Sequence, residues 1–157
     1  MVNTFDNFPR IRFWLGWTVV VVLYEETVYI FGSEAKIFLL SQRTSATSFA
    51  LIYPLMYSFP RYMEFQHKAW REVMANRPKY IITIAPKSSL LWDGKADLWI
   101  MRQTKRLIEA DYSLVAAVTG AEPKGRSILL HEKDALLTNE QNYLARVYKR
   151  KLLSTQN

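Results

Sequence analysis

The sequence predicts one α/β domain: a three-layer, Rossmann-like arrangement with a mostly parallel sheet and an antiparallel C-terminal hairpin. Short runs rich in β-branched and aromatic residues alternate with longer runs in which apolar residues recur every three or four positions. The 157 residues, half of them apolar and 14% aromatic, suffice for one core, and the zero cysteine count excludes a disulfide framework. Strands that alternate with helices are typical of right-handed crossovers and parallel pairing.

Residues 1–26 stand apart from this alternation. Within them, residues 11–24 read IRFWLGWTVVVVLY, a run shorter than the ~20 apolar residues that a membrane-spanning helix needs. The run is similar to the core of a signal peptide, but Glu25 and Glu26 occupy the place where small residues mark a cleavage site. We therefore expect an apolar N-terminal segment, either a buried strand or a membrane-proximal remnant, followed by the α/β domain at residues 27–157.

Five strands are predicted where β-branched and aromatic residues cluster between turn residues. They are, in chain order, Thr27–Phe31, Ser48–Tyr53, Lys79–Ala85, Tyr112–Val118 and Ser127–His131. The first three are expected to be parallel, because helical runs separate them. The last two flank the short segment TGAEPKGR, which is rich in turn residues and therefore predicts an antiparallel hairpin.

Four helices are predicted from the spacing of apolar positions and from end signals. They cover Ser33–Gln42, Pro60–Asn76, Lys95–Glu109 and Asn139–Leu153. Ser33 is placed to cap the first helix, and Glu34 suits its first turn. Pro60 suits the first position of the second helix, where its missing N–H costs nothing.

The net charge is +7, from 21 Lys and Arg against 14 Asp and Glu, and the basic excess is spread over the body of the chain. Such a balance favours anionic partners: nucleic acid, phospholipid headgroups or phosphorylated sugars. The densest basic cluster consists of Arg146, Lys149, Arg150 and Lys151, on the last predicted helix. We interpret it first as a solvated helix face and second as a contact to an anionic surface.

The corner Gly32-Ser33, where a strand is predicted to meet a helix, raises the question of a nucleotide site. A dinucleotide fingerprint needs three glycines, but neither a second glycine nor a Walker pattern accompanies Gly32. Glu34 would also compete with a phosphate for the helix N-terminus. We therefore expect a structural corner and no cofactor. The polar residues near the strand ends that stay candidates for ligand binding are Ser33, Arg43, Lys87 and Ser88.

The sequence assembles no catalytic or metal-binding constellation. His67 falls in the second predicted helix and His131 at a strand end, and neither has a second histidine at metal-ligand spacing. Ser88 and Ser89 follow the third strand without the G-x-S-x-G sequence of a nucleophile elbow. We therefore expect no catalytic residue and no bound metal in this chain.

Two stretches carry a resemblance to a known family: VYIFGSEAKIFLLSQRTSATSFALIYPLM at residues 28–56 and REVMANRPKYIIT at residues 71–83. A strand ending in Gly-Ser, a helix, an arginine-bearing turn, a Tyr-Pro pair and a helix that ends before a proline follow one another. This order resembles the soluble C-terminal domain of bacterial membrane glycosyltransferases of the dolichyl-phosphate-mannose-protein mannosyltransferase type, and of the related aminoarabinose transferases. The resemblance spans residues 27–131, and Ser48 stands where that family usually has a further arginine.

The resemblance implies an accessory domain on the outer, periplasmic or extracellular, face of a membrane, attached to membrane helices of the same parent protein. Met1 would then not be the native start. No catalytic residue is carried over, because the catalytic acid of such enzymes lies in a loop between membrane helices. The implied function is a non-catalytic domain that positions the acceptor or the membrane loops, in reach of anionic lipid or lipid-linked sugar. The chain alone is expected to transfer no sugar.

Two alternatives stay open at this point. The first is a stand-alone, cytoplasmic basic protein that binds anionic lipid or nucleic acid, with nucleic acid the less expected partner. The second is a small α/β enzyme that acts on a phosphorylated small molecule through the four ligand-binding candidates at the strand ends.

Overall fold

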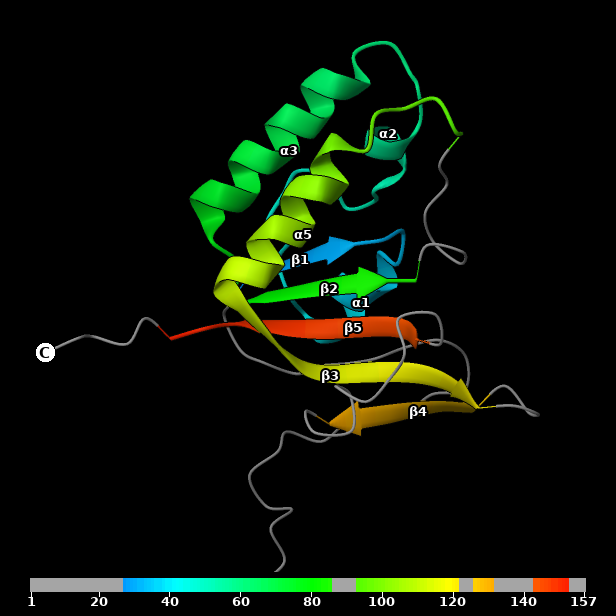
Figure 1. The fold of residues 1–157 in the computed structure, drawn as a ribbon, viewed down its shortest axis with the longest axis vertical. Helices are drawn as coiled ribbons and strands as arrows, with labels where there is room; N and C mark the ends of the chain where they lie inside the picture. The colour runs from blue at the N-terminus through cyan, green and yellow to red at the C-terminus, as the bar shows by residue number, and fades with distance from the viewer. Residues whose placement is uncertain (1–26, 86–92, 122–125, 132–142, 153–157) are drawn as a thin grey trace, which may run out of the picture.

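The computed structural model describes residues 27–85, 93–121, 126–131 and 143–152, so the expected N-terminal segment 1–26 lies outside the described residues. Five strands form one sheet in the order β1-β2-β5-β3-β4 (Figure 1). They are β1 (Val28–Phe31), β2 (Tyr80–Ile84), β3 (Tyr112–Ala121), β4 (Arg126–His131) and β5 (Tyr143–Arg150). The strands predicted at 27–31, 79–85, 112–118 and 127–131 are confirmed, with small shifts of their bounds.

The pairing within the sheet differs from the predicted one. β1 and β2 are parallel, as expected for two strands joined through helices. The pairs β2–β5, β5–β3 and β3–β4 are all antiparallel. The predicted mostly parallel, Rossmann-like class is therefore wrong, because the sheet is mixed and mostly antiparallel. The antiparallel hairpin of β3 and β4 is confirmed, with Ala121 opposite Arg126 at its turn.

This difference arises from β5. The sequence predicted a helix over 139–153, but the structure has this strand there. β5 lies between β2 and β3 and pairs with both. Its side chains alternate as in a strand: Ala145 and Val147 are buried on one face of the sheet, whereas Tyr148 packs on the other. Residues 144, 147 and 148 also have helical spacing, so the period alone did not distinguish the two structures in so short a run.

The predicted strand Ser48–Tyr53 is also wrong. The segment forms bends and leads into α2 (Tyr53–Met56). Thr47 Oγ1 donates a hydrogen bond to the carbonyl two residues further on, at 2.9 Å, and Ser48 N donates to Glu72 Oε2 at 2.7 Å. These bonds satisfy polar groups that would otherwise need a neighbouring strand. Short hydroxyl side chains often compete with regular structure in this way.

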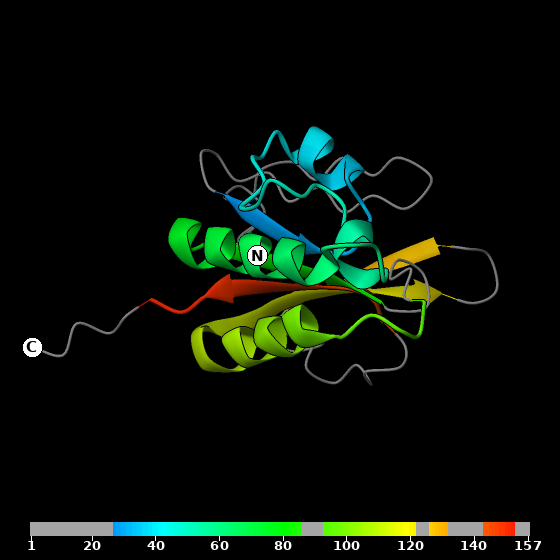
Figure 2. The ribbon, with the colours of Figure 1, turned by 90° about the horizontal axis from the view of Figure 1, so that it is seen from above.

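The other helices are α1 (Lys36–Ser41), α3 (Tyr62–Asn76) and α5 (Trp99–Asp111). The first predicted helix is shorter than expected: α1 begins at Lys36, and no side chain caps it. Figure 2 shows α1 on one side of the sheet and α5 on the other. Among the helices in the described part of the chain, none is both long and apolar enough to cross a membrane.

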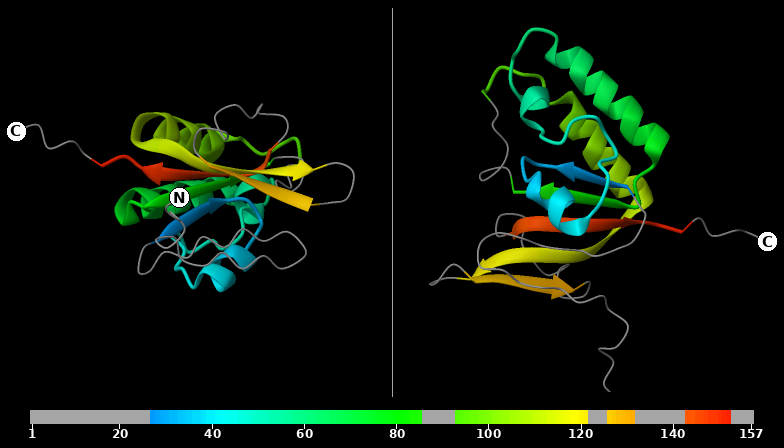
Figure 3. Two further views of the ribbon diagram at one scale, coloured as in Figure 1. Left: turned by 90° about the horizontal axis from the view of Figure 1, so that it is seen from below. Right: turned by 180° about the vertical axis from the view of Figure 1, so that it is seen from behind.

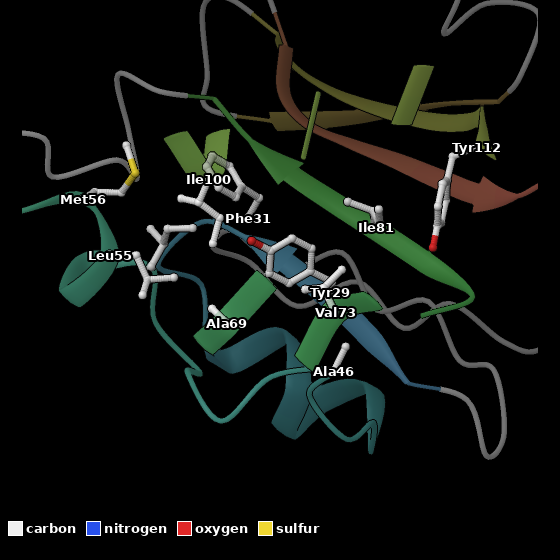
Figure 4. Packing of buried hydrophobic residues seen from close by; sticks show 11 residues of the cluster. Tyr29, Phe31, Ala46, Leu55, Met56, Ala69, Val73, Ile81, Ile100 and Tyr112 are labelled. Carbon is white, nitrogen blue, oxygen red and sulfur yellow. The ribbon is translucent and has the colours of Figure 1, made fainter. Parts of the chain in front are cut away.

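Two hydrophobic clusters hold these layers together. The first lies between α3, α5 and the sheet (Figure 4), and its buried members include Tyr29, Phe31, Val73, Ile81 and Ile100. The second joins α1 to the opposite face of the sheet, and its buried members include Val28, Ile30, Ile37, Ile82 and Val147. Because β1 and β2 contribute to both clusters, their side chains are buried on both faces, which explains their almost continuous apolar sequences.

Candidate functional site

The ends of several strands and helices meet at one edge of the sheet, on the left side of Figure 1: the starts of β1 and β2, the end of β5, and the C-terminal ends of α3 and α5. Backbone hydrogen bonds join them. Lys79 N donates to Thr27 O at 3.2 Å, Arg150 N donates to Lys79 O at 2.8 Å, and Lys151 N donates to Asp111 O at 2.8 Å. The antiparallel placement of β5 creates this meeting point, because it brings the end of that strand to the start of β2.

This edge collects basic residues from two distant parts of the sequence. We call the group Arg77, Lys79, Lys149, Arg150 and Lys151 the basic edge. Arg77 and Lys149 are exposed, and no carboxylate of the described residues lies within ion-pair distance of either. Two acids, Glu109 and Asp111, belong to the last turn of α5 that Lys151 contacts, and the five basic residues outnumber them.

Two members of the basic edge bind the ends of helices. Lys151 Nζ donates to Ala110 O at 2.8 Å and to Glu109 O at 3.3 Å, in the last turn of α5. Arg150 Nη1 donates to Arg77 O, at the C-terminal cap of α3. Helix C-termini carry carbonyls without intrahelical partners and partial negative charge, so cations are favourable there. Arg150 and Lys151 are therefore structural clamps as well as charges.

Arg77 and Lys149 occupy positions that differ from those of the two clamps, Arg150 and Lys151. Arg77 adopts a left-handed conformation, with φ 42°, as the residue that ends α3, and its backbone N donates to Val73 O. Lys149 is paired with Tyr80 and Ser113 across the sheet. It alternates with Val147, so it lies on the α1 side of the sheet, away from the helix ends that Arg150 and Lys151 bind.

Large apolar side chains are exposed beside these charges. Met74, in the last turn of α3, is 49% exposed, and Leu152, which follows Lys151 directly, is 91% exposed. The edge thus offers cations and hydrocarbon to the same partner. Single exposed apolar residues are common, but their combination with clustered charge is typical of surfaces that meet a bilayer.

Arg146, the remaining member of the cluster predicted from sequence, is separated from the basic edge. Its guanidinium lies over the ring of Tyr143, 4.3 Å from the ring centroid, in the interior of β5. Burial raises the pKa of the neighbouring Tyr148 phenol, and a hydrogen bond with Arg146 opposes this shift. The cluster that is continuous in sequence is therefore divided by the strand into Arg146 in mid-sheet and three residues at the edge.

The ligand-binding candidates do not form one group. Ser33 follows the C-terminal end of β1, whereas Arg43 lies near the other end, next to Thr44, whose carbonyl accepts from Val28 N at 3.1 Å. Arg43 is buried, with 6% exposure. Lys87 and Ser88 lie outside the described residues. The structure therefore separates the two candidates that it describes.

The Gly32-Ser33 corner is occupied by the chain itself. Gly32 O accepts a hydrogen bond from Ile52 N at 3.3 Å, which fixes the entry to α2. α1 is only six residues long and has no acid in its first turn, so Glu34 lies before the helix.

His67 packs on Trp99, with ring centroids 4.3 Å apart. In the described part of the chain, no three acidic or histidine residues are grouped as metal ligands.

Sequence reasoning missed Arg77 and Lys79 as functional candidates. They belong to the segment NRPK between a helix and a strand, a common place for solvated charge. Only the pairing of β2 with β5 shows that this segment and the C-terminal basic cluster share one surface.

No family model, curated protein or solved structure matches the chain.

Proposed function

We propose that this chain is a membrane-surface accessory domain of a lipid-linked-sugar glycosyltransferase, non-catalytic by itself, with its basic edge toward anionic headgroups. The observation that carries the proposal is the position of that edge. Lys79 N, in the basic edge, donates a hydrogen bond to Thr27 O, and Thr27 directly follows the acidic pair Glu25-Glu26 that ends the apolar segment 11–24. A bilayer associated with the apolar segment would therefore meet the basic edge first.

The charges of the edge suit this role. A Lys or Arg close to an anionic membrane surface contributes ~1 kcal/mol to binding, and the contribution decays within a Debye length. Arg77 and Lys149 have no acidic partner among the described residues, so their charge is available to headgroups. Binding of this kind is reversible and sensitive to salt.

A lipid partner is favoured over nucleic acid by two observations. Met74 and Leu152 add exposed hydrocarbon to the edge, which lipid can accept and phosphodiester backbones cannot. One aromatic group that could stack on bases contains Tyr57, which is exposed, together with the partly exposed Tyr53 and Phe59. It follows Ile52, which is bonded to the far end of β1, so this group and the basic edge do not share one surface.

The glycosyltransferase part of the proposal comes from the sequence pattern at residues 28–56 and 71–83. The separation of Ser33 from Arg43 argues against a small-molecule enzyme, because a phosphate site needs its polar groups to converge. The domain would then act on the outer membrane face by holding the acceptor or the loops of its membrane helices near the bilayer.

Vesicle binding and sugar transfer test the two parts separately. The full chain should float with phosphatidylserine-containing vesicles, and not with pure phosphatidylcholine vesicles, and salt should weaken the binding. Incubation with a lipid-linked sugar and an acceptor should give no turnover above the blank. Equal binding to both vesicle types, or to neither, would remove the membrane-surface role. Turnover that is lost in Arg43→Ala would make the chain an enzyme.

A further inference from the structure

We infer that α1 is an interfacial anchor whose outer side chains, Lys36, Leu39 and Leu40, enter the headgroup region of the same anionic bilayer. This inference rests on the proposed membrane-surface function and adds a second contact to it. The partner is lipid in both cases, but the contact at α1 depends mainly on apolar burial and the contact at the basic edge mainly on charge.

The orientation of α1 follows from its burial pattern. Successive residues of a helix are turned by about 100°, so positions 36, 39 and 40 share one face. Ile37 and Ser41 are buried on the opposite face, with Ile37 in the cluster that covers β1 and β2. Leu39 is 79% exposed and Leu40 45% exposed. Both leucines therefore point away from the protein.

This pattern is the reverse of an ordinary surface helix, which places charged or polar residues outward. Here the outer face holds two adjacent leucines and one lysine, which is exposed. Lysine at the border of such a face can bury its methylene groups while its ammonium reaches the phosphates. Leucine beside lysine is the composition of helices that lie in the membrane interface.

α1 is also connected to the basic edge. The chain that leaves α1 returns along β1: Thr44 O accepts from Val28 N at 3.1 Å, and Ser45 forms a parallel bridge with Val28. On the other side of β1, Lys79 N donates to Thr27 O. The segment that follows α1 and the basic edge thus flank the N-terminal end of β1, and Figure 3 shows α1 itself on the face of the sheet opposite α5. Lys149 lies on this same face of the sheet.

A bilayer fits this surface better than a second copy of the chain. An anionic membrane offers phosphates to the basic edge and hydrocarbon to the leucines at one surface. A symmetric dimer through this face of α1 would bring the two exposed Lys36 side chains into one interface, which is unfavourable.

The chain has no cysteine, so single labels can be introduced without background. We would attach an environment-sensitive fluorophore to Leu39→Cys and, as the control, to Lys105→Cys on the exposed surface of α5. With phosphatidylserine-containing vesicles, the label at 39 should shift to the blue and be quenched by spin-labelled lipid, whereas the label at 105 should not change. The unlabelled double variant Leu39→Ser/Leu40→Ser should bind the same vesicles about tenfold more weakly, as expected for two partly exposed leucines that lose apolar burial.

The outcomes separate this inference from the proposed function. If vesicle binding persists and depends on the basic edge, but the label at 39 stays in water and the double serine variant binds like the wild type, the anchor is refuted and the membrane role survives. If the wild type binds no vesicles, both fail. If the leucine variants instead change the mass of the protein in solution from dimer to monomer, with vesicle binding unchanged, a second copy covers α1 and the anchor is refuted.

Discussion

The side-chain oxygen of Gln66 accepts a hydrogen bond from the backbone N–H of Ile100 at 2.9 Å. The amide nitrogen of the same fully buried side chain donates to Leu55 O and to Asp97 O, each at 2.7 Å. One residue of α3 thus satisfies backbone groups of α2, of the loop before α5 and of the first turn of α5. Gln66, Leu55 and Ile100 are buried, so this side chain takes the place of water as a partner for their backbone groups and determines how the three elements meet.

Replacing Gln66 by leucine should destabilise the protein strongly. The change preserves much of the volume but leaves the buried N–H of Ile100 and the buried carbonyl of Leu55 without their partner, and each such group costs ~1–3 kcal/mol. The carbonyl of the exposed Asp97 adds less, because water can reach that residue. We expect the free energy of unfolding in urea to fall by about 3 kcal/mol or more. Gln103→Leu on α5 is the matched control and should change it little. A loss below about 1 kcal/mol for Gln66→Leu would refute the assigned role.

Tyr29→Phe should behave in the opposite way. The Tyr29 hydroxyl is buried beneath α5 and, like the hydroxyl of Thr104, has no hydrogen-bond partner within the described residues. Burial raises the pKa of this phenol well above its usual value, and the Thr104 hydroxyl, which is close to it but does not form a full hydrogen bond, opposes this shift slightly. Removing an unsatisfied buried group leaves stability unchanged or improves it. Thermal unfolding would show this as an equal or higher midpoint, and a clear decrease would mean that the hydroxyl makes a bond.

Asp93 should give the protein a stability that is lost in acid. The hydroxyl of Ser58 donates to its carboxylate, and so do the backbone N–H groups of Ala96, Lys95 and Ser58, so the pKa of Asp93 lies well below its usual value. A lowered folded-state pKa adds stability that is complete above the unfolded value of about 3.9 and is lost progressively as the pH falls from there toward the lowered folded-state pKa.

The comparison of Asp93→Asn with the wild type tests this linkage. Urea unfolding between neutral pH and pH 3 should show a steeper loss of stability for the wild type than for Asp93→Asn. Ser58→Ala removes the largest contribution and should give an intermediate slope. Identical slopes in all three proteins would show that the carboxylate is not stabilised in the folded state.

The clamps of the basic edge should be separable from its free charges. Lys151→Ala removes two hydrogen bonds to the C-terminal carbonyls of α5 and should lower the free energy of unfolding by about 0.5–1 kcal/mol. Lys149→Ala removes an exposed charge and should stay within about 0.5 kcal/mol of the wild type. If Lys151→Ala and Lys149→Ala lower the free energy of unfolding in urea equally, the distinction between clamps and free charges is wrong.

Local signals were sufficient for the elements that are long or clearly bounded. The apolar run at β2 and the turn-rich segment between β3 and β4 predicted their structures, and the periodic pattern from Tyr62 to Asn76 predicted α3. These features depend on neighbours in sequence, which explains why a single chain shows them.

What local signals could not predict was the partner of each segment. The sequence YLARVYKR satisfies helical and extended spacing alike, and its basic end suits a helix C-terminus. It became β5 because β2 and β3 pair with it on both sides. The basic edge was hidden for the same reason: Lys79 and Lys149 are 70 positions apart and meet only through that pairing.

The central claim is that the basic edge binds an anionic membrane surface, and charge reversal at the edge tests it most directly. The variant Arg77→Glu/Lys149→Glu should bind phosphatidylserine-containing vesicles on the order of 100-fold more weakly than the wild type, because each Lys or Arg near the surface contributes ~1 kcal/mol. The control Lys95→Glu/Arg102→Glu has the same net charge but changes residues at the N-terminal end of α5. We expect the control to retain most of the binding. Equal loss in both variants would mean that only net charge matters and would contradict the account.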